Sequence, residues 1–188
     1  KMTNEQKRKL AAPCGLYCGA CSIYRANQRG DIELLGQIAG AFSAVEGQLL
    51  PGMPPLRKDC DISEVQKQVA GVESATCEGC LSGVLAFPCS ICGFRQCAFG
   101  KGLTNCAQCA DSPCQLLVDF NNDGLPHHGE VLLNIQRQKD IGISAWIIEQ
   151  EERWRCPTCG GAIDWYATQC PDCGAVLNNP WSPPQGLG

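Results

Sequence analysis

The chain has 188 residues, a formal net charge of −4 and 44% hydrophobic residues, and this hydrophobic share includes sixteen cysteines. Such a length suits one compact domain with a small appendage and excludes a large multidomain enzyme. Because Lys7-Arg8-Lys9 is the only compact basic run, the composition also argues against a nucleic-acid-binding surface, which needs clustered Lys and Arg.

The cysteines are expected to bind metal rather than to form disulfides. A cysteine that binds metal no longer contributes to the apolar core. A chain with a small apolar core needs disulfides or bound metals to stabilise its fold. A Cys-x-x-Cys loop sets two sulfurs on one metal, whereas disulfide frameworks span longer loops. The polar start lacks the apolar stretch of a secretory signal, and no run of about 20 apolar residues would cross a membrane. We therefore expect a reducing, cytoplasmic setting.

Residues 1–121 are predicted to form a Cys-rich metal-binding domain. A short helix is expected over residues 3–10, ahead of the first cysteine group. A second helix is expected from Asp31, a favourable N-cap, to Val45, with one apolar stripe facing the core. Ser63 and Gln66 form a capping-box pattern that predicts a third helix, ending near Ala70.

The block from residue 77 to residue 114 is so dense in cysteine that little regular structure is expected, and metal must organise it. Ser112 and Pro113 then supply a cap and a first-turn proline for a helix over residues 115–120. Residues 122–153 are predicted to be a helical connector of two helices broken at Gly142. Ser144 is expected to cap the second of these helices, and Trp146 and Ile147 are expected to pack inward.

Residues 154–176 carry the clearest motif, a predicted zinc ribbon, and residues 177–188 are predicted to be an irregular tail. The two halves of the predicted ribbon are Cys156-Pro-Thr-Cys159-Gly-Gly and Cys170-Pro-Asp-Cys173-Gly. In each half, glycine after the second cysteine takes the left-handed turn that aims N–H groups at the sulfurs. Two such knuckles on a short β-hairpin would close one tetrahedron around zinc, and a rubredoxin-like iron site is the alternative. Trp154, Trp165 and Tyr166 are expected to cover the hairpin.

The other twelve cysteines suffice for three further sites, so about four zinc ions are expected. Grouped in chain order, these sites are Cys77, Cys80, Cys89 and Cys92; Cys97, Cys106, Cys109 and Cys114; and Cys14, Cys18 and Cys21 with Cys60. Interleaved pairing remains equally open, because spacing alone does not exclude it.

Two readings with iron compete with zinc in residues 14–114. The Cys14-x-x-x-Cys18-x-x-Cys21 spacing also occurs in radical enzymes that use S-adenosylmethionine, but Ala20 stands where an aromatic residue is usual, and no strand–helix repeat supplies a barrel. Iron–sulfur electron transfer stays open as the alternative function. Against it, no cysteine in this region precedes a proline, as the last cysteine of the bacterial ferredoxin run does.

A catalytic centre is not evident in the sequence. His127 and His128 are the only histidines, and their place after Pro126 favours a turn over metal ligation. No nucleophile with a neighbouring base stands out, so no catalytic residue is assigned, and whether the chain is an enzyme is left uncertain, leaning towards not.

The cysteine motifs, with the sequence around them, are specific enough to compare with known families. They are Cys14-Gly-Leu-Tyr-Cys18-Gly-Ala-Cys21-Ser-Ile-Tyr24, Cys77-Glu-Gly-Cys80, Cys92-Gly-Phe-Arg-Gln-Cys97-Ala, Lys101-Gly102, and Cys106-Ala-Gln-Cys109 with Pro113-Cys114. With the helical extension over residues 141–154 and the ribbon after it, they resemble the longer form of the prokaryotic domain of unknown function 3795, over residues 13–176. The resemblance implies a cysteine-rich, metal-binding soluble protein with no assigned activity.

The sequence therefore predicts a small α-rich (α+β) protein in which helices pack around metal-organised loops, with a C-terminal β-hairpin zinc ribbon. The predicted function is zinc binding with structural metals, in a protein-interaction or adaptor module. A protein partner is expected; nucleic acid and membrane are not.

Overall fold

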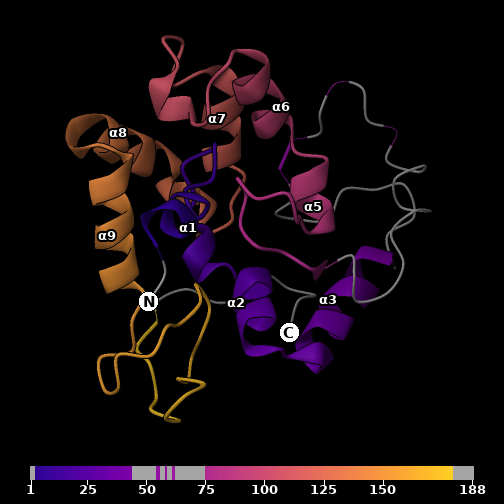
Figure 1. The fold of residues 1–188 in the computed structure, drawn as a ribbon, viewed down its shortest axis with the longest axis vertical. Coiled ribbons are helices and arrows are strands. Elements are labelled where there is room, and N and C mark those ends of the chain that lie inside the picture. The colour runs from indigo at the N-terminus through magenta and orange to yellow at the C-terminus, as the bar shows by residue number, and fades with distance from the viewer. Residues whose placement is uncertain (1–2, 44–53, 56–57, 59–60, 62–74, 180–188) are drawn as a thin grey trace.

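The computed structural model describes residues 3–43, 54–55, 58, 61 and 75–179. Over these residues it contains eight α-helices, three 3-10 helices and no β-strand (Figure 1). Cys60, the predicted helix from Ser63 to Ala70 and the tail beyond residue 179 lie outside the described residues. The elements are α1 (Asn4–Arg8), η1 (Cys18–Ala20), α2 (Ser22–Arg29), α3 (Ile32–Ser43), α5 (Phe87–Ser90), α6 (Gly93–Gly100), η3 (Cys106–Gln108), α7 (Gln115–Asn121), η4 (His128–Glu130), α8 (Val131–Ile141) and α9 (Ile143–Arg153).

The α8–α9 pair lies along one side of the molecule, and α7 and η3 pack on α8 while α1 packs on α9 (Figure 1). The two helices meet at Gly142, whose φ of 83° and ψ of 151° lie in a region that is strained for other residues. Trp146 and Ile147 are buried, with exposures of 0% and 2%. The predicted break and the inward residues are therefore confirmed. Ser144, however, lies inside α9, and Gly142 occupies the N-cap position.

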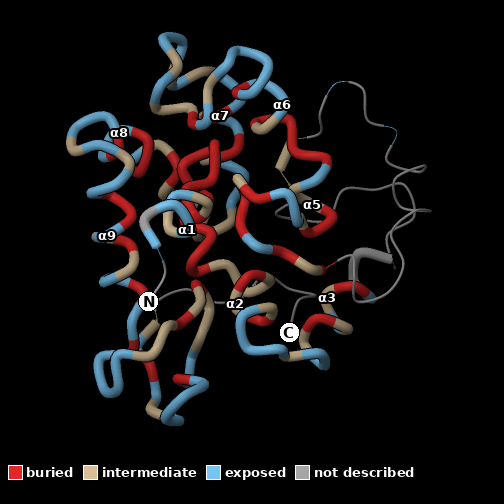
Figure 2. The backbone as a smooth tube through the Cα atoms, viewed as in Figure 1, coloured by how far each residue is buried: buried red, intermediate tan, exposed pale blue. Residues whose placement is uncertain are grey.

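The core is centred on the loop between α1 and η1, where buried residues run through the middle of the molecule (Figure 2). Tyr17 meets Trp146 edge to face at 6.1 Å between ring centroids. A second aromatic contact joins Phe94 of α6 to Phe120 of α7 at 5.0 Å. Through Tyr17, the loop between α1 and η1 thus packs against α9, which is far from it in the sequence.

The N-terminal helices α1 and α3 begin as the sequence predicts. Thr3 caps α1 in a reciprocal capping box with Gln6. The Asp31 side chain accepts a hydrogen bond from the Leu34 N–H at 3.0 Å, and Ile32 opens α3. Helix α2, which was not predicted, ends at Gly30 in the left-handed conformation.

The cysteine-dense block holds more regular structure than predicted. Helix α6 buries Phe94 and Ala98, four residues apart, on its inner face. That apolar pair offsets the poor helix propensity of the two glycines at its ends. The helix after Pro113 is confirmed as α7, but its N-cap is Cys114 rather than Ser112.

The predicted β-hairpin of the ribbon is wrong, and so is the α+β part of the predicted class, because residues 154–176 form no strand. Each knuckle is instead closed by one isolated antiparallel bridge, Arg155 with Ala162 and Gln169 with Val176. A continuous ladder is absent there because the Trp165 N–H donates to Ala20 of η1 at 2.9 Å. The segment between the knuckles is thus tied to the helical part and not to a partner strand.

Candidate metal centre

The two C-terminal knuckles have the same local backbone structure. The Cys156 N–H donates to the Gly161 carbonyl at 2.7 Å, and the Cys170 N–H donates to the Ala175 carbonyl at 2.8 Å. The glycines after the second cysteines, Gly160 and Gly174, have φ of +74° and +72°. The left-handed turns predicted from the sequence are therefore confirmed.

The knuckles bring their four sulfurs together. Cys156 and Cys173 are 3.8 Å apart and Cys159 and Cys170 are 3.6 Å apart, measured between Sγ atoms. All four Sγ atoms lie within 4.8 Å of one another. Four sulfurs bound at about 2.3 Å to one tetrahedral zinc stand about 3.8 Å apart. The group thus matches the size of a single-ion site.

Backbone N–H groups in the knuckles favour the thiolate form that metal binding requires. Those of Cys159 and Thr158 lower the pKa of the Cys156 thiol to about 6. The Gly161 N–H donates to Cys159 Sγ at 3.4 Å, but the thiols of Cys173 and Cys170 raise the pKa of Cys159 to about 12. The neighbouring thiols therefore hinder the ionisation of Cys159, and a divalent cation would relieve that effect.

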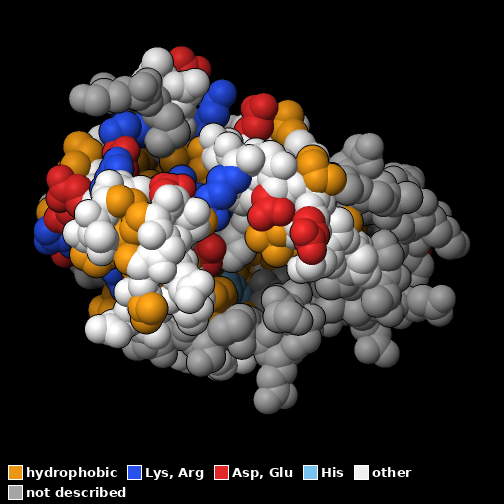
Figure 3. All heavy atoms as spheres, turned by 90° about the horizontal axis from the view of Figure 1, so that it is seen from below, with side chains coloured by type: hydrophobic (Ala, Val, Ile, Leu, Met, Phe, Trp, Pro, Cys, Tyr) orange, Lys and Arg blue, Asp and Glu red, His pale blue; other side chains and the backbone are white. Residues whose placement is uncertain are grey.

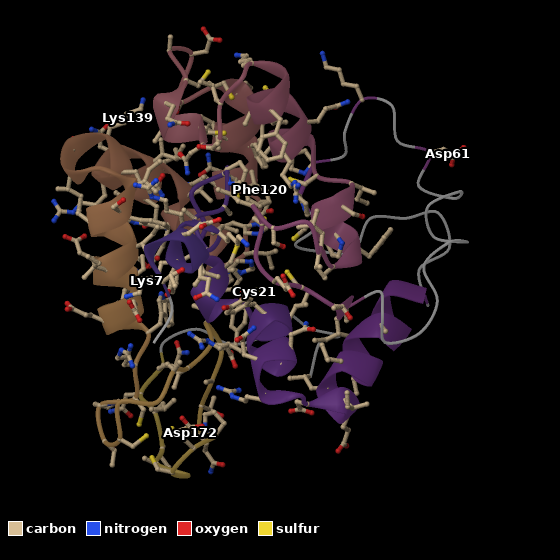
Figure 4. The ribbon with its side chains drawn as sticks, in the orientation of Figure 1. Lys7, Cys21, Asp61, Phe120, Lys139 and Asp172 are labelled. Carbon is tan, nitrogen blue, oxygen red and sulfur yellow. The ribbon has the colours of Figure 1, made fainter. Side chains whose placement is uncertain are left out.

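One ligand of each knuckle faces the protein and the other faces solvent. Cys156 and Cys170 are 2% and 1% exposed, whereas Cys159 and Cys173 are exposed. In Figure 4, Asp172 marks this group at one end of the molecule, away from the central sulfurs near Cys21. The protein therefore covers the site only on the side of Cys156 and Cys170.

Aromatic residues hold the knuckles against the helical part. Trp165 stacks on the His127 ring with centroids 4.3 Å apart and an interplanar angle of 20°. Tyr166 Oη lies 2.5 Å from Nδ1 of His127. His128 is buried, with its Nδ1 2.7 Å from an Asp123 carboxylate oxygen. The sequence predicted Trp165 and Tyr166 as a cover for the ribbon, but their histidine partner lies too far along the chain for a local pattern to reveal.

The cysteines of the central block fall into two neighbourhoods. In the first, the Cys80 thiol donates to Cys89 Sγ at 3.9 Å, and the Cys80 N–H donates to Cys18 Sγ at 3.4 Å. In the second, four cysteines line a cavity of about 30 Å³ beside Lys101, whose Nζ lies 3.4 Å from Cys109 Sγ. These four are Cys97, Cys106, Cys109 and Cys114.

A comparison with protein families matches residues 10–119 to the model described as "Protein of unknown function (DUF3795)". The chain belongs to the DUF3795 family. No curated protein and no solved structure matches it. The DUF3795 match contains both central neighbourhoods and ends before the C-terminal knuckles, so the four-sulfur group lies outside it.

Within the DUF3795 region, the grouping of the sulfurs into metal sites stays a prediction. Cys92, predicted to join Cys77, Cys80 and Cys89, is the N-cap of α6. Burial, and then the charge of Cys92, raise the pKa of Cys14. Among the described residues, the C-terminal group alone has three or more ligand atoms within 4.8 Å of one another.

The glycines that follow Cys18 and Cys92 differ in conformation from those of the C-terminal knuckles. Gly19 lies in η1 and Gly93 opens α6, so neither takes the left-handed turn of the C-terminal knuckles. Across the described residues, no helix is both long and apolar enough to span a bilayer.

Proposed function

We propose that this DUF3795 protein binds zinc structurally and serves as a protein-interaction or adaptor module. The observation that carries the proposal is the closed C-terminal group, whose Sγ separations of 3.6 and 3.8 Å suit one tetrahedral ion. Four protein sulfurs fill all four positions of such an ion. A structural site has this property, whereas a catalytic zinc keeps one position for water or substrate.

Zinc is proposed over a rubredoxin-like iron because closed four-cysteine sites are a common form of structural zinc site. The test is metal analysis of protein purified without oxygen, compared with the double variant Cys159→Ser/Cys173→Ser. We expect the variant to contain one zinc fewer. Iron at this site, or a metal content unchanged by the double substitution, would overturn the proposal.

The charges on the described surface support a protein partner over nucleic acid. Lys, Arg, Asp and Glu side chains are mixed on the face in Figure 3. Several cations are paired with carboxylates, including Lys7 with Glu151, Arg137 with Glu149, and Arg153 with Glu130. Such pairs leave little positive field for phosphates. Salt-dependent binding to single- or double-stranded nucleic acid at low ionic strength would contradict this proposal.

We propose a reducing, cytoplasmic location, because thiolate ligands must remain reduced. The described cysteines are all free thiols. The surface offered to a partner would be that of α9 and the knuckles, where Ile148 and Val176 are 51% and 77% exposed. Cross-links from a partner to these two elements would support this surface, and cross-links confined to α3 would overturn it.

A second candidate function, iron–sulfur redox chemistry, is favoured by one observation. Cys97, Cys106, Cys109 and Cys114 surround a cavity, and no three of their sulfurs lie within 4.8 Å of one another. A polynuclear cluster places its irons between the sulfurs and so holds them farther apart than a single ion does. Brown protein with acid-labile sulfide would establish this function, and colourless protein containing only zinc would exclude it.

A further inference from the structure

A second group of thiols is assembled from three segments of the DUF3795 region. Cys18 comes from η1, Cys77 and Cys80 come from the loop before α5, and Cys89 comes from α5 itself. Cys80 lies between two of the others, because its thiol donates to Cys89 Sγ at 3.9 Å and its N–H donates to Cys18 Sγ at 3.4 Å. The separation of Cys80 and Cys89 is close to the tetrahedral edge of about 3.8 Å expected around one zinc.

Cys77 closes the other end of this group. It stands three residues before Cys80, and a Cys-x-x-Cys loop places two sulfurs at the distance that one metal needs. The four sulfurs thus form an open chain, in which contacts join Cys18, Cys80 and Cys89 and the loop joins Cys77 to Cys80. A further cysteine of the first motif, Cys21, is the N-cap residue of α2, and its side chain makes no capping hydrogen bond.

The loop over residues 77–80 shares an N–H to sulfur hydrogen bond with the C-terminal site, although Leu81 and not glycine follows its second cysteine. The Gly79 N–H donates to Cys77 Sγ at 3.4 Å, as the Gly161 N–H does to Cys159 Sγ in the C-terminal site. Gly79 has φ of +106°, and a Cβ at this position would lie 2.7 Å from the Lys9 carbonyl oxygen. Glycine is therefore required at position 79 both by the backbone conformation and by the close approach of the Lys9 carbonyl.

Packing alone does not account for these contacts. Buried cysteines often serve as small apolar side chains, and such thiols need no backbone donors. Here two N–H groups point at sulfurs, one of them across 62 residues of sequence. Donors of this kind favour thiolates, which are the metal-binding form.

We propose that Cys18, Cys77, Cys80 and Cys89 bind a second structural zinc, which joins the first cysteine motif to the central block. Zinc draws the open chain of sulfurs into a tetrahedron. This assignment differs from the grouping in chain order, since Cys18 takes the place of Cys92. The ion would hold η1 against the loop before α5.

Zinc counts in paired variants test which cysteines share an ion. We expect Cys18→Ser and Cys89→Ser each to lose one zinc, and the double variant to lose no more than either alone. The matched control is the double variant Cys92→Ser/Cys89→Ser. Its zinc loss should equal the sum of the zinc losses of the two single variants. Two zincs lost from the Cys18/Cys89 double variant, or non-additive losses from the Cys89/Cys92 pair, would overturn the proposal.

If the variants fail to fold, the assignment can be tested on the wild-type protein instead. Zinc is withdrawn stepwise with a chelator, exposed thiols are alkylated, and the modified cysteines are counted by mass spectrometry. Cys18, Cys77, Cys80 and Cys89 should become reactive in one step, and separate steps for Cys18 and Cys89 would contradict the assignment. The C-terminal cysteines form a different step, so failure here is distinguishable from failure of the proposed C-terminal zinc.

Discussion

The substitution Cys159→Ser/Cys173→Ser isolates the contribution of metal to the C-terminal knuckles. Both thiols are exposed, so their replacement removes metal ligands while leaving the core intact. The two loops, 156–161 and 170–175, contain twelve residues, and ordering their backbone costs roughly 12–24 kcal/mol. Their four backbone hydrogen bonds return about 2–6 kcal/mol in total. The remaining deficit, roughly 6–22 kcal/mol, brackets the apparent binding energy of about 10–16 kcal/mol for a structural zinc.

The double variant should therefore lose order in both knuckles. Hydrogen exchange provides the assay, read at the amides of Cys156 and Cys170, which are hydrogen-bonded within the loops. We expect both amides to lose protection in the variant, while Trp146 and its neighbours in α9 keep theirs. Thr158→Ser, an exposed change in the same loop, serves as the control. Full protection of both amides in the double variant would refute the reasoning, because it would show that the loops are ordered without metal.

Three further predictions concern the helical part. Trp146→Ala removes the fully buried ring that meets Tyr17 and should lower the free energy of unfolding by about 3–5 kcal/mol in urea titrations; a loss below about 1 kcal/mol would contradict the packing. Gly142→Ala should destabilise by about 1–3 kcal/mol because of its φ and ψ, whereas Gly36→Ala, with open space around its Cβ in α3, should stabilise by up to about 1 kcal/mol; equal effects of the two changes would be inconsistent with this account. Burial, and then the charge of His128, lower the pKa of His127 to about 3, compared with about 6.5 in the unfolded chain. Because the unfolded chain takes up a proton more readily, the fold loses stability as the pH falls below about 6.5. Between pH 6.5 and 5 the wild type should thus lose roughly 1.5 kcal/mol more than His127→Phe, and parallel pH profiles would argue against it.

The C-terminal site was predictable because its determinants are local. Each knuckle places two cysteines and a glycine within six residues, and the left-handed Gly160 and Gly174 follow from that spacing. The break at Gly142 and the inward position of Trp146 are local in the same sense.

The features that the sequence did not reveal depend on contacts between distant residues. The predicted hairpin is missing because the Trp165 N–H bonds to Ala20, and neither residue's neighbourhood signals the other. The approach of Cys18 to Cys80 likewise spans 62 residues, so spacing left chain-order and interleaved pairing equally open. Helix α6 was missed because its cysteine and glycine content hid the apolar pair of Phe94 and Ala98.

The account depends most on one ion held by the sulfurs of Cys156, Cys159, Cys170 and Cys173. An anomalous-scattering map recorded at the zinc absorption edge from crystals of the metal-loaded protein tests it directly. The map should show a peak about 2.3 Å from each of the four Sγ atoms. A peak at the iron edge instead, an empty position, or electron density joining these sulfurs as disulfides would contradict the account.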